Sequence, residues 1–154
     1  MKPKNAVRLD RTIGSWLVYP LHKRLYRLTG GRVGKKTAQG PVILLTHTGR
    51  KSGKEFTTPL LSVPHPDGER AGWIVVASNG GRPEHPQWYR NVQVNPDVEV
   101  QDGRRRIAAV ATVASPERRA ELWPFVGEQY EGWHHYQTLT DREIAVIEIR
   151  PADS

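Results

Sequence analysis

The chain has 154 residues, no cysteine and a formal net charge of +7 at pH 7. This length fits one domain, and the missing cysteine excludes disulfides, thiolate metal sites and a cysteine nucleophile. No apolar stretch is long enough to span a membrane, and the basic N-terminus lacks the apolar core of a secretory signal. We therefore expect a cytoplasmic protein.

The positive charge lies mostly near the N-terminus. Residues 1–54 contain 13 Lys or Arg and one acid, whereas residues 55–154 contain 10 Lys or Arg and 15 acids. Such a chain is expected to bind something anionic with its first third, for example a phosphorylated coenzyme, a membrane surface or nucleic acid. The simpler alternative is a solubilising charged face.

A loose polar arm and one helix are expected at the start of the chain. The helix spans 12–28, because apolar residues recur there at helical spacing: Ile13, Trp16, Leu17, Leu21, Leu25 and Leu28. Pro20 kinks this helix or marks its true start, and Gly30-Gly31 ends it. Residues 1–30 are thus expected to precede a single domain over 31–154.

The remainder predicts short strands joined by turns. After a polar connector at 35–40, the expected strands are 42–45, 57–63, 73–77, 98–101, 104–113 and 144–149. A helix over 87–94 stops before Asn95-Pro96, and another begins with Ser115 as cap and Pro116 in its first turn. Hairpins with a few helices predict an α+β protein whose antiparallel sheet closes as a barrel.

The segment Gly49–Lys54, which we call the basic turn, joins two of these strands. It combines two glycines, Ser52 and three cations. Glycines let a ligand approach the backbone, and cations neutralise phosphate or carboxylate. It is not a nucleotide-binding P-loop, because three residues separate its glycines and a strand follows. An ordinary basic hairpin turn is the alternative.

Two aromatic clusters are further candidates. In the first, Ser78-Asn79-Gly80-Gly81 precedes the helix start at His85–Asn91, where exposed N–H groups favour an anion or a carbonyl-rich ring. Packing of Trp88 and Tyr89 in the core is the alternative. In the second, Tyr130, Trp133 and His134 share a predicted helix face, which could be a pocket wall or a partly buried surface.

Several other site types are disfavoured by spacing. None of the six histidines forms a His-x₃-His pair, and neither the Gly-x-Ser-x-Gly elbow nor the Gly-x-Gly-x-x-Gly fingerprint occurs. Metal, serine-hydrolase and Rossmann-type nicotinamide sites are therefore not expected. Base-stacking RNA motifs are also missing, so nucleic acid is not an expected partner.

Taken together, the clusters resemble the deazaflavin-dependent nitroreductase family, the F420H2-dependent quinone-reductase-like proteins of actinobacteria. The matching segments are Leu44–Lys54, Thr58-Pro59-Leu60, Val76–Gly81, Pro86–Asn91, Asn95-Pro96, Leu122-Trp123-Pro124, Tyr136-Gln137 and Thr140-Asp141-Arg142. The resemblance covers about residues 40–151. It implies a split β-barrel of the flavin-reductase type with a few flanking helices.

The resemblance also implies a set of coenzyme and substrate contacts. Arg50, Lys51 and Ser52 match positions that bind the phosphate and oligoglutamate tail of coenzyme F420. The other implied coenzyme contacts are Phe56, Thr57, Thr58, Pro59, Leu60, Leu61, Val76, Ala77, Ser78, Asn79, Gln87, Trp88, Tyr89, Arg90, Asn91 and Trp133. Family members that reduce nitro groups tend to have tyrosine where this chain has Leu61 and Trp133. The resemblance implies a substrate pocket at Leu61, Ser78, Tyr130, Trp133 and Tyr136, of which Ser78, Tyr130 and Tyr136 are the polar catalytic candidates.

The implied reaction is hydride transfer from F420H2 to a quinone, an activated enone or a nitroaromatic acceptor. A deazaflavin delivers hydride from its own ring, so the protein needs no nucleophile or metal of its own. One alternative is a split-barrel oxidoreductase that uses FMN. Another is a binding protein that docks on a membrane surface through its basic N-terminal helix. The oligomeric state is left open.

Overall fold

The computed structural model describes residues 23–29, 36–37 and 40–153. Residues 23–29 are helical, in agreement with the end of the expected first helix. The expected arm, the first part of that helix, Pro20 and Gly30-Gly31 lie outside the described residues.

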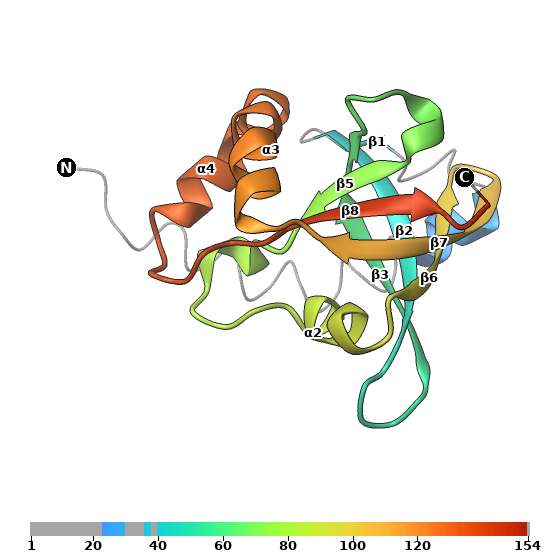
Figure 1. The fold of residues 1–154 in the computed structure, drawn as a ribbon. Coiled ribbons are helices and arrows are strands. Elements are labelled where there is room, and N and C mark those ends of the chain that lie inside the picture. Colours follow the sequence, from blue (N-terminus) through green and yellow to red (C-terminus); the bar gives the residue numbers. More distant parts are fainter. Residues whose placement is uncertain (1–22, 30–35, 38–39, 154) are drawn as a thin grey trace.

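The described strands form one antiparallel sheet (Figure 1). They are β1 (Lys36–Thr37), β2 (Gly40–Thr48), β3 (Glu55–Leu61), β4 (Val63–Pro64), β5 (Trp73–Val76), β6 (Asp97–Asp102), β7 (Arg105–Val113) and β8 (Val146–Pro151). Their order is β1-β2-β6-β7-β8-β5-β4, and β3 also pairs with β2. The expected connector at 35–40 is therefore partly strand.

One interrupted strand curls this sheet into a barrel. Only Ser62 separates β3 from β4, yet β3 pairs with β2 while β4 pairs with β5. The two ends of the sheet are thus joined by consecutive residues, and the amide of Ser62 donates to the carbonyl oxygen of Pro41 at 2.9 Å. The expected single strand over 57–63 is therefore two strands. The predicted barrel is confirmed, with an opening along β3.

The helices are α2 (Gln87–Val94), α3 (Pro116–Gln129) and α4 (Glu131–Gln137), with short 3₁₀ turns η1 (Glu69–Ala71) and η2 (Asn79–Gly81). The predicted bounds of α2 are confirmed. So is the cap of α3, because the Ser115 hydroxyl accepts a hydrogen bond from the amide of Arg118 at 3.2 Å. Within residues 23–29, 36–37 and 40–153, no helix combines the length and hydrophobicity needed to cross a bilayer.

Alternate residues of the strands face two different apolar layers, as the twofold side-chain period requires. The barrel interior is filled from all sides, and α2 closes it with Trp88, Tyr89 and Val92. On the other face of β5 and β8, Ile74 and Val146 pack under α3 and α4, which lie together on one side of the barrel in Figure 1.

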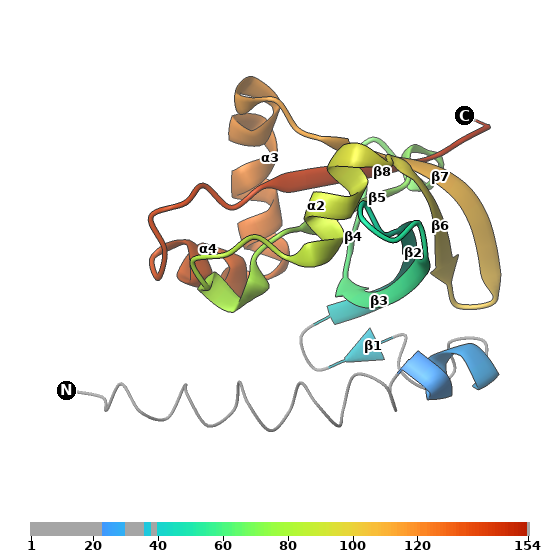
Figure 2. The same ribbon diagram turned by 90° about the horizontal axis from the view of Figure 1, so that it is seen from below.

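A third, smaller layer lies outside β2. There Tyr26 from residues 23–29 packs on Val42 and Leu44 and is fully buried. Figure 2 shows this helical segment against the barrel wall, away from α3 and α4.

Candidate functional site

The basic turn extends from the end of the β2–β3 hairpin, beyond α2 (Figure 1). It is closed by two backbone hydrogen bonds, from the amide of Gly49 to the oxygen of Lys54 at 2.7 Å and from the amide of Gly53 to the oxygen of Gly49 at 2.9 Å. Lys51, Ser52 and Lys54 are exposed. The predicted turn thus presents its cations to solvent.

Arg50 is fixed by α2 through uncharged partners. Its amide and its Nη1 both donate to Oδ1 of Asn91, at 3.1 and 2.9 Å, and its Nη2 donates to Oε1 of Gln87 at 2.9 Å. Among the described residues, none of the three cations of the basic turn forms an ion pair with an acid. Their charge is uncompensated, so the donor set suits a polyanion such as a phosphodiester with carboxylates.

A shallow depression lies beside this turn. It is lined by Arg50, His85, Tyr89, Arg90, Gln93 and Val94. Two of these side chains are arginines, which adds a further cation next to the turn. His85, Gln93 and Val94 are not in the set implied by the resemblance, and their position depends on how α2 packs on the barrel.

Two buried side chains continue the contacts of Arg50 into the barrel. Nδ2 of Asn91 lies 3.1 Å from Nδ1 of His47, and Nε2 of His47 lies 2.9 Å from the hydroxyl of Thr58. Both Asn91 and His47 are 4% exposed. Burial lowers the pKa of His47 to about 4, so the ring is neutral at physiological pH.

The residues of β3 point alternately to two faces, so they cannot all face one ligand. Thr58 and Leu60 point inward, because they pair with Leu45 and Ile43 of the barrel core. Thr57 points outward, where its hydroxyl contacts that of Thr46 at 2.9 Å and accepts from Nη2 of Arg27 at 2.6 Å. The set implied for 56–61 therefore divides between the two faces of the strand.

Arg142 holds the loop that contains Ser78 and Asn79. Its guanidinium donates to the carbonyl oxygens of Ala77 at 3.1 Å, Ser78 at 2.7 Å and Arg82 at 2.9 Å. Asn79 adopts φ 46° and donates from Nδ2 to the oxygen of Glu84 at 2.9 Å. Within the described part of the chain, the Ser78 hydroxyl forms no hydrogen bond, which leaves it available to a substrate.

This loop lies directly against α4. A Cβ added to Gly81 would come within 2.8 Å of the carbonyl oxygen of Tyr136, so the close approach requires glycine at this position. The fold therefore brings the segment of Ser78 next to the segment of Tyr136.

The aromatic cluster is arranged differently from its predicted helix face. Tyr130 has φ −150° and lies between α3 and α4, so the expected helix face does not include it. Its ring meets Trp133 edge-on, with centroids 5.4 Å apart. His134 instead stacks on Trp123 at 4.7 Å and donates from Nε2 to the Trp123 oxygen at 2.8 Å, so the predicted shared face of Tyr130, Trp133 and His134 is wrong.

Tyr130 and Trp133 share a small cavity with Leu61. The cavity has a volume of about 50 Å³ and is otherwise lined by Gly40, Pro41, Ser62, Val63, Pro64 and Gln129. Burial and then the neighbouring Tyr136 hydroxyl raise the pKa of Tyr130 to about 12, so its hydroxyl keeps its proton at neutral pH. The structure thus places three of the implied substrate-pocket residues around one space.

The implied coenzyme contacts differ in their exposure. Val76, Ala77, Trp88, Tyr89, Asn91 and Trp133 are buried, whereas Lys51, Ser52, Phe56, Gln87 and Arg90 are exposed. Trp88 and Tyr89 pack in the barrel core, as the alternative interpretation expected. The exposed set is therefore the one whose side chains are free to meet a ligand without rearrangement.

Comparisons with known proteins identify the family of this chain. The family model of the F420H(2)-dependent quinone reductases matches residues 18–151. The F420H(2)-dependent quinone reductase Rv1261c of Mycobacterium tuberculosis is 38% identical over 143 residues, which cover 90% of this chain and 93% of that protein.

Solved structures agree as well. The F420-H2 dependent reductase FDR-A has a TM-score of 0.62 and 41% identity, covering 71% of this chain and 94% of that one. A domain-swapped dimer has a TM-score of 0.65 and 36% identity, covering 84% and 96%. The haem storage protein HutZ of Vibrio cholerae, at 13% identity, a TM-score of 0.52 and coverage of 88% and 90%, shares the fold alone. The chain belongs to the F420H(2)-dependent quinone reductase family and is an oxidoreductase that takes its hydride from reduced coenzyme F420.

Proposed function

We propose that this chain passes the hydride to a quinone, and that Arg50, Lys51 and Ser52 hold the anionic tail of the coenzyme. The observation that carries the proposal is how the guanidinium of Arg50 is held. Asn91 and Gln87 fix its guanidinium through neutral oxygens, so its charge is directed but not neutralised. A fixed, uncompensated guanidinium beside two exposed lysines favours phosphate and carboxylate groups.

The acceptor side of the site needs hydrogen-bond donors rather than a nucleophile. When bound, the reduced deazaflavin supplies the hydride. Hydride addition to a quinone leaves negative charge on a quinone oxygen, which a positioned hydroxyl can stabilise or protonate. The candidates are Tyr130, Tyr136 and Ser78, whose hydroxyl has no hydrogen-bond partner among the described residues. Trp133, 3% exposed, contributes an apolar wall that keeps water from this side of the site.

A fluorescence titration with F420 tests the tail assignment. Replacing both Arg50 and Lys51 by alanine should weaken binding by at least tenfold, because each charge-assisted contact contributes about 1.5–3 kcal/mol. The matched control is Arg104→Ala with Arg105→Ala, which removes two exposed arginines from the distant β6–β7 turn. Equal weakening by the two double variants would reduce the effect to net charge and contradict the assignment.

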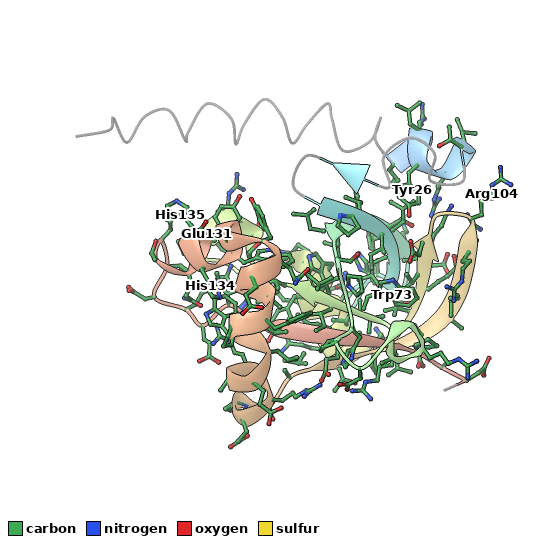
Figure 3. The ribbon with its side chains drawn as sticks, turned by 90° about the horizontal axis from the view of Figure 1, so that it is seen from above. Tyr26, Trp73, Arg104, Glu131, His134 and His135 are labelled. Carbon is green, nitrogen blue, oxygen red and sulfur yellow. The ribbon has the colours of Figure 1, made fainter. Side chains whose placement is uncertain are left out.

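We also propose a peripheral contact with an anionic membrane surface. Its support is a basic patch formed by Lys23, Arg24 and Arg27 in the helical segment and by Arg104 and Arg106 of the β6–β7 hairpin. Tyr26 joins the two parts, because its hydroxyl accepts from the amide of Gly103 at 2.7 Å and contacts the oxygen of Gln101 at 3.2 Å. Figure 3 shows Tyr26 and Arg104 on the same side of the molecule, away from His134 and His135.

Leu28 supplies the apolar part of this patch, since it is 83% exposed among these cations. A cationic surface with an exposed leucine suits an interface of anionic lipids, where a quinone would also be dissolved. Co-sedimentation with vesicles of neutral and anionic lipid tests this proposal. Leu28→Ser with Arg104→Gln should reduce pelleting with anionic vesicles only, while Lys51→Gln serves as the control for charge. Equal pelleting of all three proteins would contradict membrane contact.

A further inference from the structure

Four side chains form one continuous hydrogen-bond network from the basic turn to β3. The network runs from Arg50 to Asn91, then to His47, and ends at Thr58. Its two middle members come from α2 and β2 and are buried, while Arg50 and Thr58 at its ends are partly accessible. The middle of the network is thus shielded from water, and both ends can meet a ligand.

The direction of every hydrogen bond in this network is determined by Arg50. The amide and guanidinium of arginine can only donate, so the atom of Asn91 that they contact has to be its oxygen. The amide nitrogen of Asn91 then faces His47 and donates to Nδ1. Because Nδ1 accepts, the neutral ring carries its proton on Nε2, which donates to the hydroxyl oxygen of Thr58.

This arrangement leaves the hydroxyl hydrogen of Thr58 directed elsewhere. Within the described residues, His47 is the partner of that hydroxyl, and it already occupies an acceptor position. A hydroxyl that accepts from one side is free to donate on another. The side chain is only partly buried, and it lies on the inner face of β3 beside Phe56, which is 48% exposed and stacks on His47 with centroids 6.1 Å apart.

We infer that His47 and Asn91 are positioning residues that make Thr58 a hydrogen-bond donor toward an acceptor oxygen of the bound coenzyme. The same network holds Arg50 toward the coenzyme tail, so one set of buried groups orients both contacts. The inference rests on the proposed coenzyme site and adds to it the polarity of the contact at Thr58. A protonated His47 is incompatible with this network, because Nδ1–H would face the Asn91 amide donor.

Nuclear magnetic resonance of the free protein tests the direction of the network without coenzyme. With ¹⁵N-labelled histidine, His47 should show an unprotonated Nδ1 and a protonated Nε2 from pH 8 to pH 5. Asn91→Asp places an acceptor opposite Nδ1 and should move a proton to that nitrogen. An Nδ1-protonated ring in the native protein would overturn the inference.

Titration with F420 tests the role of Thr58. Thr58→Val removes the hydroxyl at nearly constant volume and should weaken binding about tenfold, whereas Thr58→Ser should stay within about twofold of the native protein. Thermal unfolding of each variant shows whether it folds. Equal affinity of Thr58→Val and the native protein would overturn the inference.

Asn91→Asp adds a readout that a purely structural role would not change. As pH rises, His47 of this variant loses the proton on Nε2, while the proton on Nδ1 stays in place and is donated to the new carboxylate. Nε2 then accepts a hydrogen bond, so the Thr58 hydroxyl must donate to His47 and no longer to the coenzyme. Affinity relative to the native protein should therefore fall with rising pH, and the fall should vanish when Thr58→Val is added. A pH profile parallel to the native one would count against the network. Absence of any F420 binding by the native protein would overturn the proposed function instead, and the nuclear magnetic resonance result would still decide the network.

Discussion

The guanidinium of Arg142 donates a hydrogen bond of 2.7 Å to the carbonyl oxygen of Ser78. The two residues lie 64 positions apart, and further bonds from Arg142 reach Ala77 and Arg82. The loop between β5 and α2 therefore takes its shape from the segment that precedes β8. A catalytic hydroxyl at Ser78 would be positioned by a residue that holds the backbone of its loop.

Arg142→Lys should destabilise the protein by about 1–3 kcal/mol, because one ammonium group cannot replace three guanidinium contacts. Part-buried carbonyl oxygens of Ala77 and Ser78 would then lose a partner. Urea unfolding measures this loss. Arg82→Lys is the matched control, since Arg82 has an exposed side chain in the same loop and contributes only backbone contacts to it. Similar stability of the two variants would contradict the stabilising role of Arg142 in this loop.

His47 should make stability depend on pH between about 6.5 and 4. Burial lowers its pKa to about 4 in the folded state, so the unfolded chain binds the proton more readily. Its contribution is complete above pH 6.5 and is lost as pH falls through 4, by on the order of 3 kcal/mol. His47→Gln should flatten stability in this window when unfolding is measured at several pH values. His135→Gln, at an exposed position, should leave the native dependence in place.

Glu148 should make stability depend on pH in a more acidic range than His47 does. Burial would raise its pKa, but hydrogen bonds to Oε1 from Arg118 at 2.9 Å, His65 at 2.8 Å and Arg150 at 3.2 Å outweigh burial and lower the pKa to about 2. This stabilising contribution is present above the unfolded pKa near 4.5 and is lost as pH falls through 2. Acid unfolding followed by circular dichroism should show a transition in this range that Glu148→Gln shifts to a higher pH. The exposed Glu117→Gln should not shift it.

Gly72→Ala should be among the most damaging single substitutions. Gly72 has φ 97°, and an added Cβ would overlap the carbonyl oxygen of Ile149 in β8. Relief requires β5 and β8 to separate, so a loss of more than about 3 kcal/mol is expected. Gly53→Ala is the comparison, because φ is 70° but the space around it is open, and strain alone should cost about 1–2 kcal/mol. Comparable thermal stability of the two variants would show that β5 and β8 separate at little cost in free energy, which would contradict the prediction.

Tyr130→Phe should lower the rate of quinone reduction if its hydroxyl donates to the acceptor. Because the pKa of Tyr130 is raised to about 12, the donor form persists as pH rises, and the native rate should not decline below about pH 10 on account of this group. Steady-state rates for Ser78→Ala, Tyr130→Phe and Tyr136→Phe identify the donor as the variant with the largest loss in kcat at similar KM. An unchanged kcat in all three variants would show that none of these hydroxyls donates a proton to the acceptor.

The sequence allowed good prediction of elements whose signals are local. The cap at Ser115 and the stop before Asn95-Pro96 set the ends of helices within a few residues, and both agree with the structure. The division of β3 from β4 at Ser62 was not predictable in the same way. It depends on pairing with β2 on one side and β5 on the other, and no local residue encodes that choice.

The same distinction applies to the candidate site. The basic turn was identifiable because its glycines and cations are contiguous. His47 and Arg142 were not identified as part of the site, since their partners Asn91 and Ser78 lie 44 and 64 residues away. The break between α3 and α4 takes Tyr130 out of the helical spacing of Trp133 and His134, which a continuous helical spacing could not show.

The opening of the barrel along β3 has a consequence for solubility. β3 pairs with β2 on one side, and in the described residues no strand pairs with its other side. An exposed edge of this kind invites other chains to add a strand and aggregate. Pro59 lies in the middle of the edge and has no N–H to offer, and Lys54 and Glu55 place charges at its start. The strand that borders the proposed coenzyme site is thus guarded against strand addition by its own sequence, while its remaining backbone groups on this edge are not paired with another described strand.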